Sequence, residues 1–277
     1  MGLSINTNVA AMVALQNLGS TTRQLETTQN RVSTGLKVQG AKDNAAAWAI
    51  AQGMRADVGA LGAVTSSLNR AKSITDVALA AGESISDLLV QMKEKAVAAA
   101  DGSIDTAARN ILNEDFRQLR AQISTIVQNA KFDGANLING SLPSGLEMLA
   151  DADATSAITL VPENLSIGGS IITIQNSTTL TTQAGASSAM ALISASLENT
   201  NSALARIGSV GKKVDQHLVF VNKLSDALTG GIGNMVDADM ATESARLQAL
   251  QIKQQLGVQA ISIANSAPQI ILSLFQG

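Results

Sequence analysis

The feature that most constrains the fold is a row of mainly apolar and small residues recurring in steps of four and three between residues 193 and 228. This 3.5-residue spacing, sustained over five heptads, places the whole row on one face of a continuous α-helix. The row consists of Ile193, Leu197, Thr200, Leu204, Ile207, Gly211, Val214, Leu218, Val221, Ser225 and Leu228. Since such a face must be buried against other helices, the spacing predicts a helix bundle.

The same spacing predicts two long helices in the first half of the chain. A helix near the start, capped by Asn6, Thr7 or Asn8, has apolar or small residues at every seventh position. These are Ala11, Leu18, Leu25 and Val32, interleaved with Leu15, Thr22, Gln29 and Leu36. A second helix is expected over about residues 44–100, where Asp43 or Asn44 begins it. Its seam is Val64, Leu68, Ala71, Thr75, Ala78, Gly82, Ile85, Leu89, Met92 and Ala96.

Shorter elements follow along the chain. A third helix is expected from the spacing of Leu112, Phe116, Leu119, Ile123, Ile126 and Ala130. Two β-branched blocks, 158–161 and 171–174, are bounded by glycine, proline and asparagine and predict short strands. The glycines between 230 and 233 are expected to end the helix that contains the heptad row. A last helix then starts at Asp237 or Asp239 and continues toward the C-terminus.

Composition argues against several classes of protein. The chain has a formal net charge of −3, one Trp, four Phe and no Tyr, and its lysines and arginines form no block. Nucleic-acid binding is therefore not expected, because it requires clustered cations and usually stacking aromatic residues. The absence of cysteine excludes disulfides, thiolate chemistry and cysteine-based metal sites.

The two ends of the chain carry no recognisable targeting or spanning segment. Residues 1–12 lack a basic stretch followed by an apolar one, so no cleaved signal peptide is expected. The most apolar stretch, residues 258–275, is interrupted by Gln259, Asn265, Pro268 and Gln269. Membrane insertion is therefore not expected.

A search for chemical motifs finds no persuasive candidate for an enzyme or a cofactor. His217 is the only histidine and lies within the heptad row, so we interpret it as a structural side chain. The segment 151–155 lacks the glycine and the closing glutamate of a calcium loop. The segment 206–213 lacks the first glycine and the Ser/Thr of a phosphate loop. Trp48 is read as a packing residue.

The apolar C-terminal stretch raises a question of burial. A helix striped with Leu and Ile is unstable alone in water and needs a partner to cover it. Here the last helix carries Leu247, Leu250, Ile261, Ile271, Leu274 and Phe275. We predict that these residues and Leu18, Leu25, Val32 and Leu36 form an apolar seam, covered by each other or by another molecule. Pro268 lies inside this pattern, where a kink is expected.

Several segments of the sequence resemble bacterial flagellins. Near the start these are Leu3–Asn8, Asn30–Val38 and Ala41–Ala46; near the end they are Gln254–Gly257 and Pro268–Leu274, with Ala264-Asn265 between them. The resemblance covers about residues 1–140 and 185–277 and leaves the middle unmatched.

The resemblance implies a mainly α fold, with long antiparallel helices forming a coiled-coil terminal domain and a helix-bundle domain with a small β insertion. The implied segments are the N-terminal and C-terminal halves of an inner-tube domain (1–42 and 235–277), the two parts of a helix-bundle domain (43–140 and 186–234) and a short β-rich variable segment (141–185). The short variable segment indicates a flagellin without large outer domains.

The implied function is that of a structural, non-enzymatic subunit that polymerises into the flagellar filament used for swimming. In that family the apolar seam is the self-assembly element, so Ile271 and Leu274 changed to Asp should give a soluble monomer. Implied partners are other copies or sibling flagellins, the flagellar type III export apparatus, an export chaperone, the filament cap and the hook–filament junction proteins. The implied location is extracellular, after export without signal-peptide cleavage.

One family feature is altered in this sequence. Flagellins recognised by the vertebrate innate immune receptor typically carry Leu-Gln-Arg-Val-Arg-Glu-Leu-Ala-Val on the long helix. The matching residues here are Leu89, Val90, Gln91, Met92, Lys93, Glu94, Lys95, Ala96 and Val97. Because Val90, Gln91 and Lys95 depart from the pattern, weak or no receptor activation is expected.

Three other classes of protein share part of this pattern. A hook–filament junction protein would share the terminal architecture but usually lacks such close agreement with the flagellin segments. A membrane-active toxin should have Lys/Arg-rich helix faces with aromatic anchors, and these are missing. A protease-bearing flagellin needs a zinc site with two histidines, which one histidine cannot supply.

Overall fold

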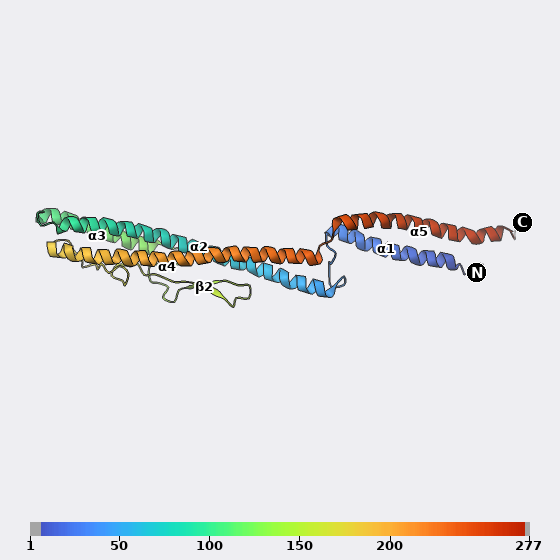
Figure 1. Cartoon of the computed structure of the whole chain (residues 1–277), viewed down its shortest axis with the longest axis horizontal. Coiled ribbons are helices and arrows are strands. Elements are labelled where there is room, and N and C mark those ends of the chain that lie inside the picture. Colours follow the sequence, from blue (N-terminus) through green and yellow to red (C-terminus); the bar gives the residue numbers. More distant parts are fainter. Residues whose placement is uncertain (1–6, 275–277) are drawn as a thin grey trace. The chain divides into compact units, whose positions relative to one another are not determined.

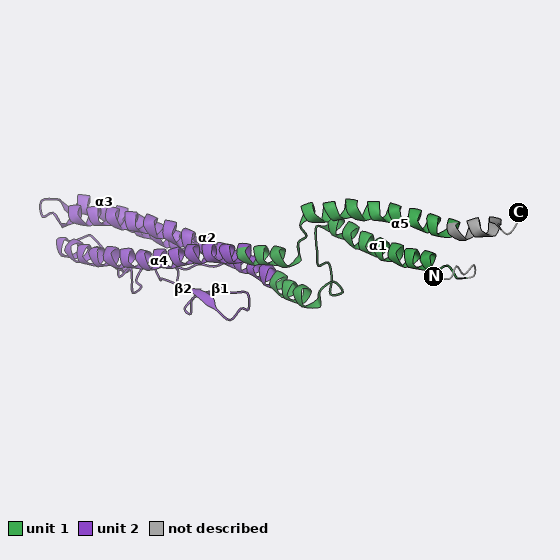
Figure 2. Ribbon diagram, turned by 45° about the vertical axis from the view of Figure 1, so that its right-hand side comes forward, with its two compact units in different colours: residues 1–56, 227–277 green, residues 57–226 purple. Residues whose placement is uncertain are grey.

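The computed structural model describes residues 7–274, with side chains described up to residue 266. Figure 1 shows a mainly helical chain, which confirms the predicted fold class. The elements are α1 (Val9–Thr34), α2 (Ala45–Ala100), α3 (Thr106–Asn129), β1 (Leu146–Leu149), β2 (Ala157–Leu160), α4 (Gln183–Val236) and α5 (Met240–Leu274). Contacts divide the chain into two units, residues 1–56 with 227–277 and residues 57–226 (Figure 2).

In the first unit, α1 and α5 lie side by side and antiparallel (Figure 1). Asn8 caps α1, since its Oδ1 accepts the amide of Ala11 at 3.0 Å. Gly35 ends α1 in the left-handed conformation, with φ of 72°, which glycine adopts without a Cβ clash. Asp239 caps α5 by accepting the amide of Ala241 at 3.0 Å.

The segment that follows α1 is held against the end of α4. Backbone amides of Lys37 and Val38 donate to the carbonyl of Val236 at 2.8 and 3.3 Å. A small apolar cluster forms there around the buried side chains of Val38, Ala51 and Val236. Trp48 is one of the partly buried residues that pack on this cluster, as expected from the sequence.

The glycines at 230–233 do not end α4 as predicted, because the helix continues to Val236. A Cβ on Gly231 would lie 2.9 Å from Cε of Met54, so the glycine permits a close approach to α2. Glycine inside a helix costs only about 1 kcal/mol, which packing of this kind can offset.

In the second unit, α2 and α4 pack antiparallel. The ion pair of Lys72 with Asp215 (2.7 Å) and the hydrogen bond of Ser86 to Asn201 (3.3 Å) fix their relative direction. The seam predicted for α2 is buried along its full length, from Val64 to Ala96. α3 contributes Phe116, Ile123 and Val127 to the buried core.

The segment between α3 and α4 contains one antiparallel hairpin in the described chain, in which Leu146 of β1 pairs with Leu160 of β2. Residues 158–160 lie in β2, in agreement with the first predicted strand. The second predicted strand, 171–174, is wrong. Its isoleucines are buried, but the amide of Thr173 donates to Oγ of Ser196 on α4 at 3.0 Å. Its backbone therefore bonds to side chains of α4 and, through the carbonyl of Ile174, to the amide of Gly168, and it forms no strand.

Candidate functional site

An exposed apolar groove runs along α1 and α5 in the first unit. It has a volume of about 910 Å³ and is lined almost entirely by apolar side chains. The lining residues are Val9, Ala10, Val13, Ala14, Asn17, Leu256, Gly257, Ala260, Ile263 and Ala264. Val9, Val13, Leu256 and Ile263 are each between 51% and 66% exposed. Because monomeric proteins rarely expose continuous apolar surface of this kind, the groove indicates an interaction surface.

The apolar residues predicted from the sequence lie mainly where α1 and α5 touch, beside this groove, since Gly257 both lines the groove and contacts Leu18. Leu25 and Leu250 are buried, whereas Leu18, Val32, Leu247 and Ile261 are half-buried. A Cβ on Gly257 of α5 would lie 3.2 Å from Cδ1 of Leu18, so the glycine lets α1 approach closely.

Four of the predicted seam residues lie away from this contact or outside the described side chains. Leu36 packs on the cluster around Val38. The backbones of Ile271 and Leu274 belong to α5, but their side chains are outside the described part. Phe275 lies outside the described residues altogether. α5 continues through Pro268 as a helix.

The exposed apolar side chains of the groove were missed by the sequence analysis, which followed a single seam. A signal was nevertheless present, because Ile252, Leu256 and Ile263 form a second row at helical spacing. Each of these three side chains is at least 58% exposed. α5 therefore has an apolar surface on two sides, of which the pairing with α1 covers one.

Two polar contacts connect α1 and α5 near the two ends of the pair. The Asn8 side-chain amide donates to the carbonyl of Ala264 at 2.8 Å, and Arg31 pairs with Glu243 at 2.9 Å. Glu243 is buried, and its second carboxylate oxygen has no hydrogen-bond partner among the described atoms. The contacts join residues 8 with 264 and 31 with 243, so they set one antiparallel register.

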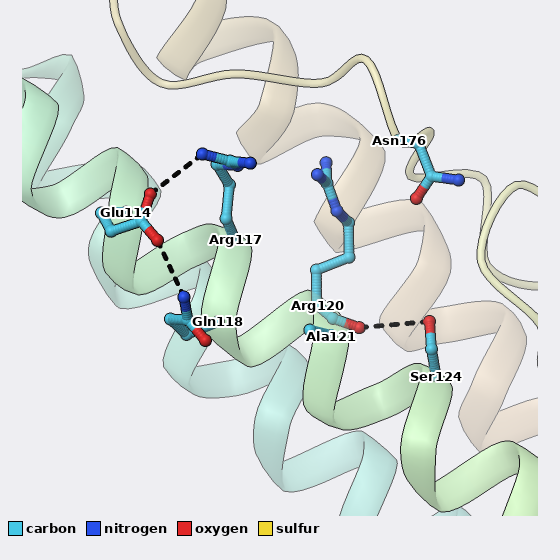
Figure 3. Close-up of a pocket in the computed structure, with 7 residues that line it drawn as sticks. All are labelled: Glu114, Arg117, Gln118, Arg120, Ala121, Ser124 and Asn176. Atoms are coloured by element: carbon cyan, nitrogen blue, oxygen red, sulfur yellow. Dashed lines mark hydrogen bonds and ion pairs between the residues drawn. The ribbon is translucent and has the colours of Figure 1, made fainter.

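A polar pocket of about 370 Å³ lies on α3 in the second unit (Figure 3). Figure 3 shows Glu114 bonded to both Arg117 and Gln118, while Arg120 points toward the chain segment of Asn176. The Arg120 guanidinium donates to the carbonyls of Gln175 and Thr178, and partial burial lowers its pKa. These side chains bond to each other and to the backbone, so the pocket serves to fasten the segment before α4.

The other chemical candidates have structural partners. His217 lies 2.6 Å from the carbonyl of Ala150, and Asp151 accepts the hydroxyl of Thr155 at 2.6 Å. The bond from Thr155 is the largest of the contacts that lower the pKa of Asp151. Within residues 7–274 there is no group of three or more His, Asp or Glu side chains that could hold a metal ion.

The residues matching the receptor patch lie on α2. Leu89 is buried, Lys93 is half-buried, and Val90 and Gln91 are exposed. Lys95 forms an ion pair with Asp115 of α3 at 2.7 Å. A long helix that could cross a membrane does not occur in the described part of the chain.

Comparison with known proteins gives agreement over nearly the whole chain. Residues 5–142 match the bacterial flagellin N-terminal helical region, and residues 190–275 match the bacterial flagellin C-terminal helical region. Flagellin FljM of Caulobacter vibrioides is 49% identical over 99% of this chain and 98% of the relative. A flagellin of Brucella melitensis is 36% identical over 99% of each chain.

A solved structure of a putative flagellar hook-associated protein from Vibrio parahaemolyticus shares the fold. It has a TM-score of 0.57 and 13% identity, over 70% of this chain and all of that one. Both helical regions of the family match this chain, and flagellins agree with it over nearly its full length. Its terminal helices are also paired in the structure. The chain belongs to the bacterial flagellin family, whose members are structural subunits of the flagellar filament.

Proposed function

We propose that the apolar groove on α1 and α5 is the main assembly surface of this flagellin, and that its occupants are the terminal helices of neighbouring copies. The observation that carries the proposal is the exposure of Val9, Val13, Leu256 and Ile263 in a single chain. Full burial of a side chain of this size is worth about 1.5–3 kcal/mol. Four such residues would therefore favour assembly strongly, before the entropy of association is subtracted.

The predicted seam has a second role in this proposal. Leu18, Leu25, Val32, Leu247, Leu250 and Ile261 join α1 to α5, and the joined pair then presents the groove. We assign Leu36, Ile271, Leu274 and Phe275 to the same seam on the basis of the sequence pattern alone. Pairing and polymerisation support each other, because each buries the apolar side that the other leaves exposed.

Finer aspects of the function follow from membership of the family and are proposed on that basis. The subunit is exported by the flagellar type III apparatus with a chaperone, and it functions outside the cell. It adds to the filament beneath the cap and beyond the hook–filament junction proteins, with or without sibling flagellins. The segments 1–42 and 235–277 would form the inner tube, and 43–140 and 186–234 the layer around it, with 141–185 as the variable segment.

The test places charge in the groove without disturbing the pairing of α1 and α5. Leu256→Asp with Ile263→Asp should abolish polymerisation and leave a soluble, helical monomer. Gln255→Asp with Gln259→Asp is the matched control, since both glutamines are exposed on the same helix. Sedimentation and negative-stain microscopy report the polymer, and circular dichroism reports the fold. Normal filaments from the first variant would disprove the proposal.

A further inference from the structure

A row of exposed residues runs along the outer side of α2, opposite its buried seam. The row has the same steps of three and four residues as a heptad seam, so all its members share one face of the helix. It consists of Asp76, Ala80, Glu83, Asp87, Val90, Glu94 and Val97, all of which are exposed. We call it the acidic row. Glu83 and Glu94 form no ion pair with any described residue.

A second exposed row lies on the outer side of α4. It consists of Ser209, Lys212, Gln216, Val219 and Lys223, again in steps of three and four. We call it the lysine row. Lys212 and Lys223 form no ion pair within the described chain. Val219 is 53% exposed, and the neighbouring Phe220 is 56% exposed, so the row combines positive charge with apolar surface.

The two rows match in spacing as well as in charge. Glu83 and Glu94 are eleven residues apart, and so are Lys212 and Lys223. When an α2 and an α4 lie antiparallel, one register places Glu94 opposite Lys212 and Glu83 opposite Lys223. Within one chain the register is different, since Lys72 pairs with Asp215 and Ser86 with Asn201. The two rows therefore cannot meet inside one subunit.

We propose that the acidic row of one subunit docks against the lysine row of a second copy of this chain. The inference rests on the filament function and adds a lateral contact that is separate from the groove on α1 and α5. The contact joins two different surfaces, so it is heterologous and can propagate along an open helical polymer. The difference between the two registers is about 20 residues, which corresponds to a stagger of about 30 Å between neighbouring parallel copies.

The test exchanges charges between the two rows in the full-length protein. The first variant carries Glu83→Lys and Glu94→Lys; the second carries Lys212→Glu and Lys223→Glu. Each turns two attractive pairs into repulsive ones, so the critical concentration for polymerisation should rise about tenfold or more. Glu147→Lys with Asp153→Lys is the control, since both carboxylates are exposed and lie outside the rows.

Two combinations should restore assembly. A chain with all four changes, and an equimolar mixture of the two variants, both regain opposite charges across the contact. Their critical concentration should return to within about threefold of the original protein. Circular dichroism of each monomer checks that the helices are intact.

Two results would overturn the inference. One is polymerisation of both single-row variants at the concentration of the control. The other is loss of assembly in both variants with recovery in neither combination, because the charges would then not pair with each other. Neither result bears on the groove, which is tested separately by Leu256 and Ile263. High salt should also weaken the contact, since the Debye length falls from about 8 Å at 0.15 M to about 3 Å at 1 M.

Discussion

Gly82 of α2 lies directly against Leu204 of α4, so that a Cβ atom on Gly82 would overlap Cδ2 of the leucine. One heptad away the arrangement is reversed, and a Cβ on Gly211 of α4 would lie 3.0 Å from Cγ2 of Thr75 on α2. Each helix thus has one glycine that leaves a gap in its surface, which we call a notch, and one side chain that packs into the notch of the other helix. Sliding α4 by a heptad would place Leu204 opposite Leu89 or Thr75 in place of Gly82, so the close approach of Leu204 to the glycine favours the observed register.

The first prediction concerns this notch. Gly82→Ala should be less stable than Gly62→Ala by about 1–3 kcal/mol, because the added methyl overpacks the seam at Gly82 only. Gly62 is the matched control, since it is exposed on the same helix with no atom within 4 Å of an added Cβ. There the substitution should stabilise the helix by up to about 1 kcal/mol. The free energy of unfolding in urea measures both.

A double mutant separates overpacking from other effects. Leu204→Ala makes room for the methyl, so combining it with Gly82→Ala should cost less than the sum of the two single changes. A coupling of about 0.5–3 kcal/mol is expected for residues in contact. If the two changes in unfolding free energy were strictly additive, the added methyl group would not be in contact with Leu204.

The second prediction concerns the pH dependence of α5. Asp239 accepts the hydroxyl of Thr242 at 2.7 Å and the amide of Ala241, and these contacts hold the pKa of its carboxyl below the usual range of an aspartate. A lowered pKa in the folded state means that the cap stabilises the protein above the unfolded pKa. This contribution is lost as the pH falls through the folded value.

The measurement compares melting temperatures between pH 6 and pH 2. Asp239→Asn keeps a capping side chain but cannot titrate, so its melting temperature should fall less on acidification than that of the original protein. Glu26→Gln removes an exposed carboxylate from α1 and should show the original acid sensitivity. Identical curves for Asp239→Asn and the original protein would contradict the role of the cap.

The third prediction concerns the receptor patch on α2. The chain should activate the vertebrate flagellin receptor weakly or not at all in a reporter-cell assay, because Val90, Gln91 and Lys95 replace the usual residues. Val90→Gln, Gln91→Arg and Lys95→Leu together bring these three positions to the family pattern and should raise the response. The ion pair of Lys95 with Asp115 is exposed, so its loss should not unfold the bundle. Full potency of the unaltered chain would refute the prediction.

The long helices were predictable because their periodicity is repeated many times. The α2 seam from Val64 to Ala96 needs no information beyond the spacing of its apolar and small residues. Capping was equally local, and both Asn8 and Asp239 were among the candidates that the sequence offered. These features depend on residues within one or two helical turns of each other, so the sequence contains their causes in full.

Predictions failed where a distant residue decided the outcome. The block 171–174 has strand-like composition, yet Ser196 of α4 takes the backbone bond that a strand would use. The glycines at 230–233 look like a helix end, yet the approach of Met54 makes a small residue suitable inside α4. In each case the competing partner lies many residues away along the chain.

The sequence by itself determined that this protein is made of long amphipathic helices, since a heptad row can be buried only by another helix. Only the tertiary structure decided which faces remain open. α5 has apolar rows on two sides, and the contacts of Gly257 with Leu18 and of Asn8 with Ala264 determine which one faces α1. Periodicity shows that an apolar face must be buried. Close packing between particular side chains decides which partner buries it.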